Sequence, residues 1–180
     1  MGFYNKANLE ELTGDDKNSA LDLENTISND KNFFLALLSR GRKEYAAGDY
    51  AHALTDLNDA INIRGDFYVA YSMRGSCKFK MGKIADAIKD FDMEIQLKPD
   101  HIMGYVNRGV AYGELKDYSS AIRDLTTAIK QDPSSSQAYL YRGQLFLGNN
   151  KKDSACLDFQ AASKLGDPEA KAYEKQYCGK

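Results

Sequence analysis

The sequence predicts an all-α protein, built as an array of four helix pairs with a closing helix. The first observation is an Arg-Gly pair that recurs every 34 residues, a period that suits two helices and their turns. The second is that residues around each pair fall into columns of one type, and the third is that Gly or Pro lies near the end of each unit. The pairs are Arg40-Gly41, Arg74-Gly75, Arg108-Gly109 and Arg142-Gly143.

Composition narrows the class of protein. The chain has 180 residues, of which 43% are apolar and 28% charged, as in soluble folded proteins. Its net charge of −2 gives no reason to expect nucleic acid, which calls for a strongly basic face. The longest apolar run, which starts at Phe33, is far shorter than the roughly 18 residues that a membrane-spanning helix needs. We therefore expect no nucleic-acid partner and no membrane insertion.

Residues 1–30 are expected to form an acidic leader. Residues 1–33 carry seven acidic and three basic side chains. Asn18 or Ser19 suits the cap of a short helix over 18–27, whereas the alternative is a mobile leader. Because the first residues lack the basic start and apolar stretch of a signal peptide, we expect a cytoplasmic protein, although a chain whose targeting signal had been removed would look the same.

The four repeats are expected over residues 31–168. Their units start at Phe34, Tyr68, Ile102 and Ser136 and cover 34–67, 68–101, 102–135 and 136–169. Positions 4, 8 and 11 of a unit share one face of its first helix, and positions 20, 24 and 27 share one face of its second. Small residues at positions 8 and 20 allow close approach of the two backbones. Position 20 is Ala53, Ala87, Ala121 and Ala155, and position 24 is Leu57, Phe91, Leu125 and Phe159.

These columns resemble the tetratricopeptide repeat. In the third unit the matching residues are Tyr105, Arg108, Gly109, Tyr112, Ala121, Leu125, Ala128 and Pro133. The resemblance covers residues 34–180 and implies a right-handed α-α superhelix that serves as a non-catalytic protein-interaction module. The polar residues 169–180 are expected to form a capping helix, and this ending is similar to that of bacterial members. Glu44 and Lys78 depart from the family, which prefers an aromatic residue at position 11.

The family's usual leucine at position 7 is arginine in all four units, and position 23 is always aspartate. The aspartates are Asp56, Asp90, Asp124 and Asp158. We expect an Arg-Asp pair in each repeat, either inside one helix pair or across to the next, because guanidinium and carboxylate bond bidentately. The rival is an arginine column that binds phosphates or acidic partners. If the pairs are structural, Asp124→Ala should destabilise the fold more than Lys116→Ala.

The outer face of the first helices is the predicted binding surface, because in this family it lines a concave peptide groove. We call its predicted residues the groove set. They are Leu38, Arg42, Tyr45, Val69, Met73, Phe79, Met103, Val106, Asn107, Val110, Gln137, Tyr141 and Gln144. Such an apolar surface predicts a protein or peptide partner, with a homodimer or cover by the leader as alternatives. Only Asn107 fits the family's carboxylate clamp and no Lys does, so an acidic chaperone tail is not expected.

No residue pattern predicts catalysis, a metal or another cofactor. His52 and His101 stand apart and are expected to be exposed to solvent. The three cysteines, Cys77, Cys156 and Cys178, are too widely spaced for a metal motif and are expected to be reduced thiols. The expected function is therefore that of a scaffold or adaptor.

Overall fold

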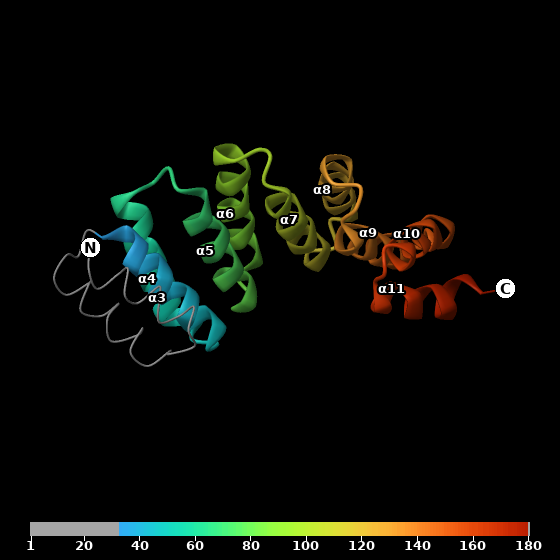
Figure 1. Cartoon of the computed structure of the whole chain (residues 1–180), viewed down its shortest axis with the longest axis horizontal. Coiled ribbons are helices and arrows are strands. Elements are labelled where there is room, and N and C mark those ends of the chain that lie inside the picture. Colours follow the sequence, from blue (N-terminus) through green and yellow to red (C-terminus); the bar gives the residue numbers. More distant parts are fainter. Residues whose placement is uncertain (1–32, 180) are drawn as a thin grey trace. The chain divides into compact units, whose positions relative to one another are not determined.

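The computed structural model describes residues 33–179, and all of its regular structure is helical (Figure 1). The first helices of the repeats begin at Phe34, Tyr68, Ile102 and Ser136, in the register of the Arg-Gly pairs. The leader and its helix over 18–27 lie outside the described residues. The elements are α3 (Phe34–Ala46), α4 (Tyr50–Ile63), α5 (Tyr68–Lys80), α6 (Ile84–Leu97), α7 (Ile102–Glu114), α8 (Tyr118–Gln131), α9 (Ser136–Gly148), α10 (Lys152–Lys164), α11 (Pro168–Tyr173) and the π-helix η1 (Glu174–Cys178).

The chain divides into two compact units, the first ending at Asp86 and the second starting at Ala87. In the first unit α3 packs on α4, and α4 packs on α5. In the second, each helix from α7 to α11 packs on the next one in the chain. The predicted all-α architecture of stacked helix pairs is therefore confirmed. No described helix has both the length and the apolar character needed to cross a bilayer.

The turn inside each repeat uses a left-handed residue at position 15. Gly48 and Gly82 occupy it with φ of 81° and 75°, a region open to glycine because it has no Cβ. Lys116 and Asn150 occupy the same position in the later repeats with φ of 59° and 57°. Side chains cap the N-terminal ends of α4, α8, α9 and α11. The N-cap residues Asp49, Asp117, Ser135 and Asp167 each accept a hydrogen bond from a backbone N–H.

The small residues at positions 8 and 20 make the predicted close contact. A Cβ added to Gly109 would lie 3.1 Å from Leu125 Cγ and 3.2 Å from the Ala121 oxygen. Ala121 and Leu125 are both fully buried. Since the interior is packed to crystal-like density, an added methyl group would require Leu125 or the backbone at Ala121 to shift by a few tenths of an ångström.

Glu94 is an exception at its repeat position, and a second exception, Gly104, makes room for its side chain. It is fully buried at position 27, where the other repeats have alanine. Its Oε1 lies 2.7 Å from Nδ1 of His101, which is therefore half-buried rather than exposed as expected. The space comes from Gly104, at a position that is alanine in the other repeats: an added Cβ there would lie 3.2 Å from Glu94 Cδ and 3.0 Å from Ile95 Cγ1.

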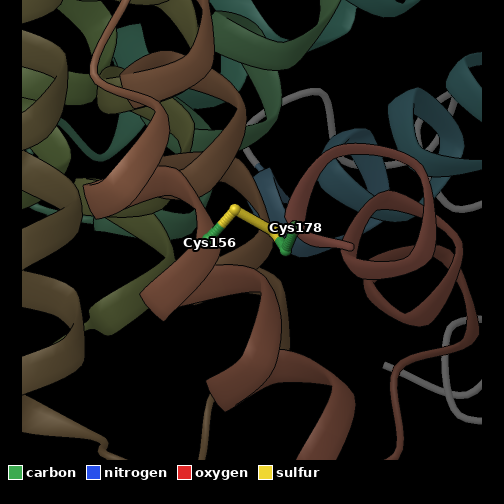
Figure 2. Close-up of a disulfide and its surroundings, with 2 residues drawn as sticks. All are labelled: Cys156 and Cys178. Atoms are coloured by element: carbon green, nitrogen blue, oxygen red, sulfur yellow. A yellow bond between two sulfur atoms is a disulfide. The ribbon is translucent and has the colours of Figure 1, made fainter. Parts of the chain in front are cut away.

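Cys156 and Cys178 form a disulfide, so the prediction that they are reduced thiols is wrong (Figure 2). Cys156 lies on α10, and Cys178 is the last residue of η1. The turn before α11 folds the closing segment back along α10, which brings together two residues 22 apart in sequence, with Cα atoms 5.5 Å apart. Cys77 is not disulfide-bonded and is fully buried, as expected.

Candidate protein-interaction site

The arginines at position 7 bind the aspartates at position 23 of the same repeat. Arg108 donates from Nε to Asp124 Oδ2 at 2.7 Å and from Nη2 to Asp124 Oδ1 at 2.8 Å. Arg40 with Asp56 and Arg142 with Asp158 form the same bidentate pair. The predicted pairing inside the helix pair is thus found in these three repeats. Arg74 and Asp90 belong to different units, and their pairing stays a prediction.

These arginines also reach back to the preceding repeat. Arg108 Nη1 lies 2.7 Å from Asp92 Oδ1, Arg142 Nη1 lies 3.0 Å from Thr126 Oγ1, and Arg74 Nη1 lies 2.8 Å from Asn58 Oδ1. The bonds with Asp124 raise the pKa of Arg108, which stays charged. Because the guanidinium groups of Arg108 and Arg142 each bond the second helices of two successive repeats, the geometry favours a structural role for this column over a phosphate-binding one.

Half of the groove-set residues of the first unit pack on its core. Arg42 is exposed, and the other residues of the set in this unit are half-buried. Leu38, Tyr45 and Met73 contact the buried cluster of Ala53, Leu57 and Cys77. Burial raises the pKa of Tyr45. The half-buried residues are Leu38, Tyr45, Val69, Met73 and Phe79.

In the second unit, one residue of the groove set lies elsewhere than predicted. Val106 is 1% exposed and packs in the core with Leu125, Ala128 and Ile129, so it does not lie on the surface. The physical reason is that position 5 packs against neighbouring helices rather than facing outward. Met103 is 40% exposed and Gln137 is exposed. The remaining residues of the set, Asn107, Val110, Tyr141 and Gln144, are half-buried.

Three residues of the groove set line a pocket of about 330 Å³ in the second unit. They are Val110 from α7 and Tyr141 and Gln144 from α9. We call this hollow the α7–α9 pocket. Five further residues complete its lining, and the prediction did not include them in the groove set. They are Gly113, Glu114, Tyr118, Leu145 and Gly148.

Two glycines in the lining of the α7–α9 pocket allow close packing. A Cβ on Gly113 would lie 2.7 Å from Leu145 Cδ2, and one on Gly148 would lie 3.3 Å from the Tyr118 ring. The glycines therefore let Leu145 approach α7 closely and the Tyr118 ring approach α9 closely. Glycines at the ends of two first helices were the sequence signal for this hollow, and the first helices of the other two repeats end without glycine.

Polar groups in the lining of the same pocket are joined by others bonded to them. Glu114 is exposed at the last position of α7. Gln144 donates from Nε2 to Glu169 Oε1 at 3.2 Å, which brings a second carboxylate beside the pocket. Gln137 donates from Nε2 to the Tyr141 hydroxyl at 3.2 Å. The pocket can therefore offer apolar contact, two tyrosine rings and negative charge to a bound side chain.

The described residues offer little for catalysis or metal binding. His52 is exposed, as expected, and its Nδ1 lies 2.6 Å from Asp49 Oδ2, a contact that raises the pKa of His52. Over residues 33–179, no three His, Cys, Asp or Glu side chains come together as a metal site would require.

Residues 106–170 match the family model described as tetratricopeptide repeat. A search of curated proteins found no match. Several solved structures are similar in fold. A crystal structure of MamA has a TM-score of 0.83 at 22% identity and covers 92% of this chain and 96% of its own. YrrB, described as a TPR protein with an unusual peptide-binding site, has a TM-score of 0.82 at 15% identity and covers 97% of this chain and 90% of its own.

A third structure is the first TPR of Spaghetti (RPAP3) bound to the HSP90 peptide SRMEEVD. It has a TM-score of 0.59 at 25% identity, and the match covers 62% of this chain and 90% of that one. The family match and these likenesses agree with the 34-residue register and with the helix pairs of each unit. Residues 106–170 thus match the tetratricopeptide repeat family model, and the chain has the fold of tetratricopeptide repeat proteins.

Proposed function

We propose that the protein is a non-catalytic interaction module, a scaffold or adaptor that binds a segment of a partner protein on the outer face of its first helices. The observation that supports this proposal most is the α7–α9 pocket, because three residues of the groove set, Val110, Tyr141 and Gln144, line it. Half-buried apolar and aromatic residues around a pocket with a few polar groups are typical of peptide-binding sites.

The proposed partner inserts side chains into the surface rather than presenting an acidic chain end. Peptide binding is described for YrrB and for the RPAP3 repeat, which is similar in fold to part of this chain. The groove set has no lysine to hold a terminal carboxylate. Asn107, Gln137 and Gln144 are half-buried or exposed and can orient the partner's backbone by hydrogen bonds, while Val110 and Tyr141 supply apolar contact area.

The test is to select binding peptides from a random display library on the full chain and to measure their affinities by calorimetry. Tyr141→Ala and Val110→Ala should each weaken binding by about tenfold, or about 1.4 kcal/mol. Lys130→Ala is the matched control, because Lys130 is exposed on α8 and does not line the pocket. If the pocket variants bind as tightly as the wild type, the proposed surface is not the binding site.

Self-association through the same face is the alternative, and the observation that favours it is Met103, a methionine that is 40% exposed. The solution mass of the full chain, measured over a wide concentration range, separates the two functions. A dimer that Met103→Asp dissociates would favour a structural homo-oligomer. A wild-type monomer that still selects peptides would favour the interaction module.

A further inference from the structure

The α7–α9 pocket has three sources of negative charge, and the partial positive charge of the N-terminal end of α8 at Tyr118 is opposed by its capping carboxylate, Asp117. Glu114 is in the last position of α7, and Gly113 precedes it. Leu145 and Gly148 come from the last turn of α9. The C-terminal end of a helix carries partial negative charge on its last carbonyl groups, so two helix ends and one carboxylate surround the same hollow.

Glu114 lies at the C-terminal end of α7, where a negative charge destabilises the helix. A carboxylate in the last turn is repelled by the helix dipole, which prefers basic residues there. Among the described residues no ion pair involves Glu114, and the residues that line the pocket include no Lys, Arg or His. A positive charge supplied from outside the pocket would therefore meet an unopposed carboxylate.

The remaining lining suits the stem of a long side chain. Val110 and Leu145 offer apolar contact, and Tyr118 and Tyr141 bring two aromatic rings to the same pocket. Lysine and arginine have apolar stems with a charged end, and cations are attracted to aromatic faces. An acidic side chain would be repelled by Glu114, and a purely apolar one would bury that carboxylate beside it without a partner.

We propose that the α7–α9 pocket receives a lysine or arginine side chain of the partner segment. The stem lies on Val110 and Leu145, the rings of Tyr118 and Tyr141 contact the cation, and Glu114 forms an ion pair with it. This assignment rests on the proposed function and specifies the chemistry of the partner at that site.

The test compares peptides selected from one random display library on the wild-type chain and on Glu114→Gln. Wild-type selections should be enriched in Lys or Arg at one position, and the enrichment should be absent on Glu114→Gln. Replacing that basic residue by methionine in a selected peptide should weaken binding to the wild type about tenfold and binding to Glu114→Gln much less. Asp153→Asn is the control, because it removes one exposed carboxylate of the same unit outside the pocket.

The outcomes separate this inference from the proposed function. Wild-type peptides that bind the pocket without a preferred basic residue would overturn the inference and leave the proposed function standing. Failure of the wild type to select any peptide would overturn both. Equal loss of affinity in Glu114→Gln and Asp153→Asn would assign the effect to net charge and would also overturn the inference.

A second inference comes from the disulfide between Cys156 and Cys178 (Figure 2). It joins the end of the closing segment to α10. The same segment is held by the fully buried Ala170 and by the Tyr173 ring, which stacks on Phe159 with centroids 4.9 Å apart. Helices as short as α11 and η1 are not stable alone, so the covalent link fixes a cap that would otherwise depend on few contacts.

We infer that the protein matures in an oxidising compartment. The two thiols lose two protons and two electrons as the S–S bond forms, and a thiol–disulfide oxidoreductase of that compartment accepts the electrons. Cytosolic proteins are kept reduced and rarely contain structural disulfides, so this link favours an oxidising compartment over the cytoplasmic location expected from the sequence. The third thiol, Cys77, is fully buried in the first unit and does not compete in the folded chain.

The test is peptide mapping of the protein from its native source, with free thiols alkylated in acid at lysis. The expected result is one linked peptide that contains Cys156 and Cys178 in most of the chains, and alkylated Cys77 once the protein is unfolded. A Cys77→Ser variant should give the same linkage. Alkylation of Cys156 and Cys178 in most chains would overturn the inference, as would a link that changes partner in Cys77→Ser.

Discussion

Replacing Asp124 by alanine should destabilise the fold by about 3 kcal/mol. The substitution removes two hydrogen bonds from Arg108, at 2.7 and 2.8 Å, and hydrogen bonds to charged groups contribute about 1.5–3 kcal/mol each. Removing one member of a buried ion pair costs about 3–5 kcal/mol, because the other charge is left buried. The lower end applies here, because the Arg108 side chain is 19% exposed and keeps its bond with Asp92.

The assay is urea unfolding of the full chain followed by circular dichroism. Lys130→Ala is the reference, because Lys130 is exposed in the same helix and should change stability by less than about 0.5 kcal/mol. It is a better reference than Lys116, whose φ of 59° makes its substitution sensitive to the turn. In melting temperature, Asp124→Ala should lose roughly 6–12 °C.

A second variant separates the ion pair from simple loss of packing. Arg108→Leu combined with Asp124→Ala removes both charges, so it should be less destabilised than Asp124→Ala alone. Equal stability of Asp124→Ala and Lys130→Ala would refute the structural reading of the arginine column.

Three further predictions concern the turn, the disulfide and a half-buried carboxylate. Lys116→Gly should stabilise the chain by about 0.5–1 kcal/mol in urea unfolding, since glycine adopts the left-handed φ freely; no gain would contradict the turn geometry. Replacing Cys156 and Cys178 together by serine should cost about 3 kcal/mol for the 22-residue loop, and a reductant should then have no further effect on stability. Burial raises the pKa of Glu44 above its ordinary 4.5, so the folded chain loses stability as pH rises from 4.5 through the raised pKa. Glu44→Gln should therefore melt higher than the wild type at neutral pH, and this gain should vanish below pH 4.5. A gain independent of pH would contradict the assignment.

The helix pairs were predictable because the residues that make each packing contact recur in every repeat. Gly109, Ala121 and Leu125 recur as small, small and large residues at one spacing, and this spacing matches the period of helices that pack closely. The Arg-Asp pairs followed from the same register, since both columns are invariant over the four units. Whether the pairs lay inside a repeat or between repeats depended on side-chain reach, which the sequence does not encode directly.

Features that occur once were not predictable in this way. Helical periodicity alone places Val106 on the outward face of its helix, but Ala138 and Ile129 of neighbouring helices pack with it and bury it. The disulfide depends on the closing segment folding back along α10, and no other repeat has a cysteine pair to indicate it. Glu94 and Gly104 depart from their columns together, and only their contact in space relates the two changes.

The most direct test of the interaction-module account is a map of backbone amide shifts in the isotopically labelled full chain during titration with a selected peptide. The account predicts that the largest shifts fall in the last turns of α7 and α9 and at Tyr118, around the α7–α9 pocket. Shifts concentrated on the outer faces of α8 and α10, with these turns unchanged, would contradict it.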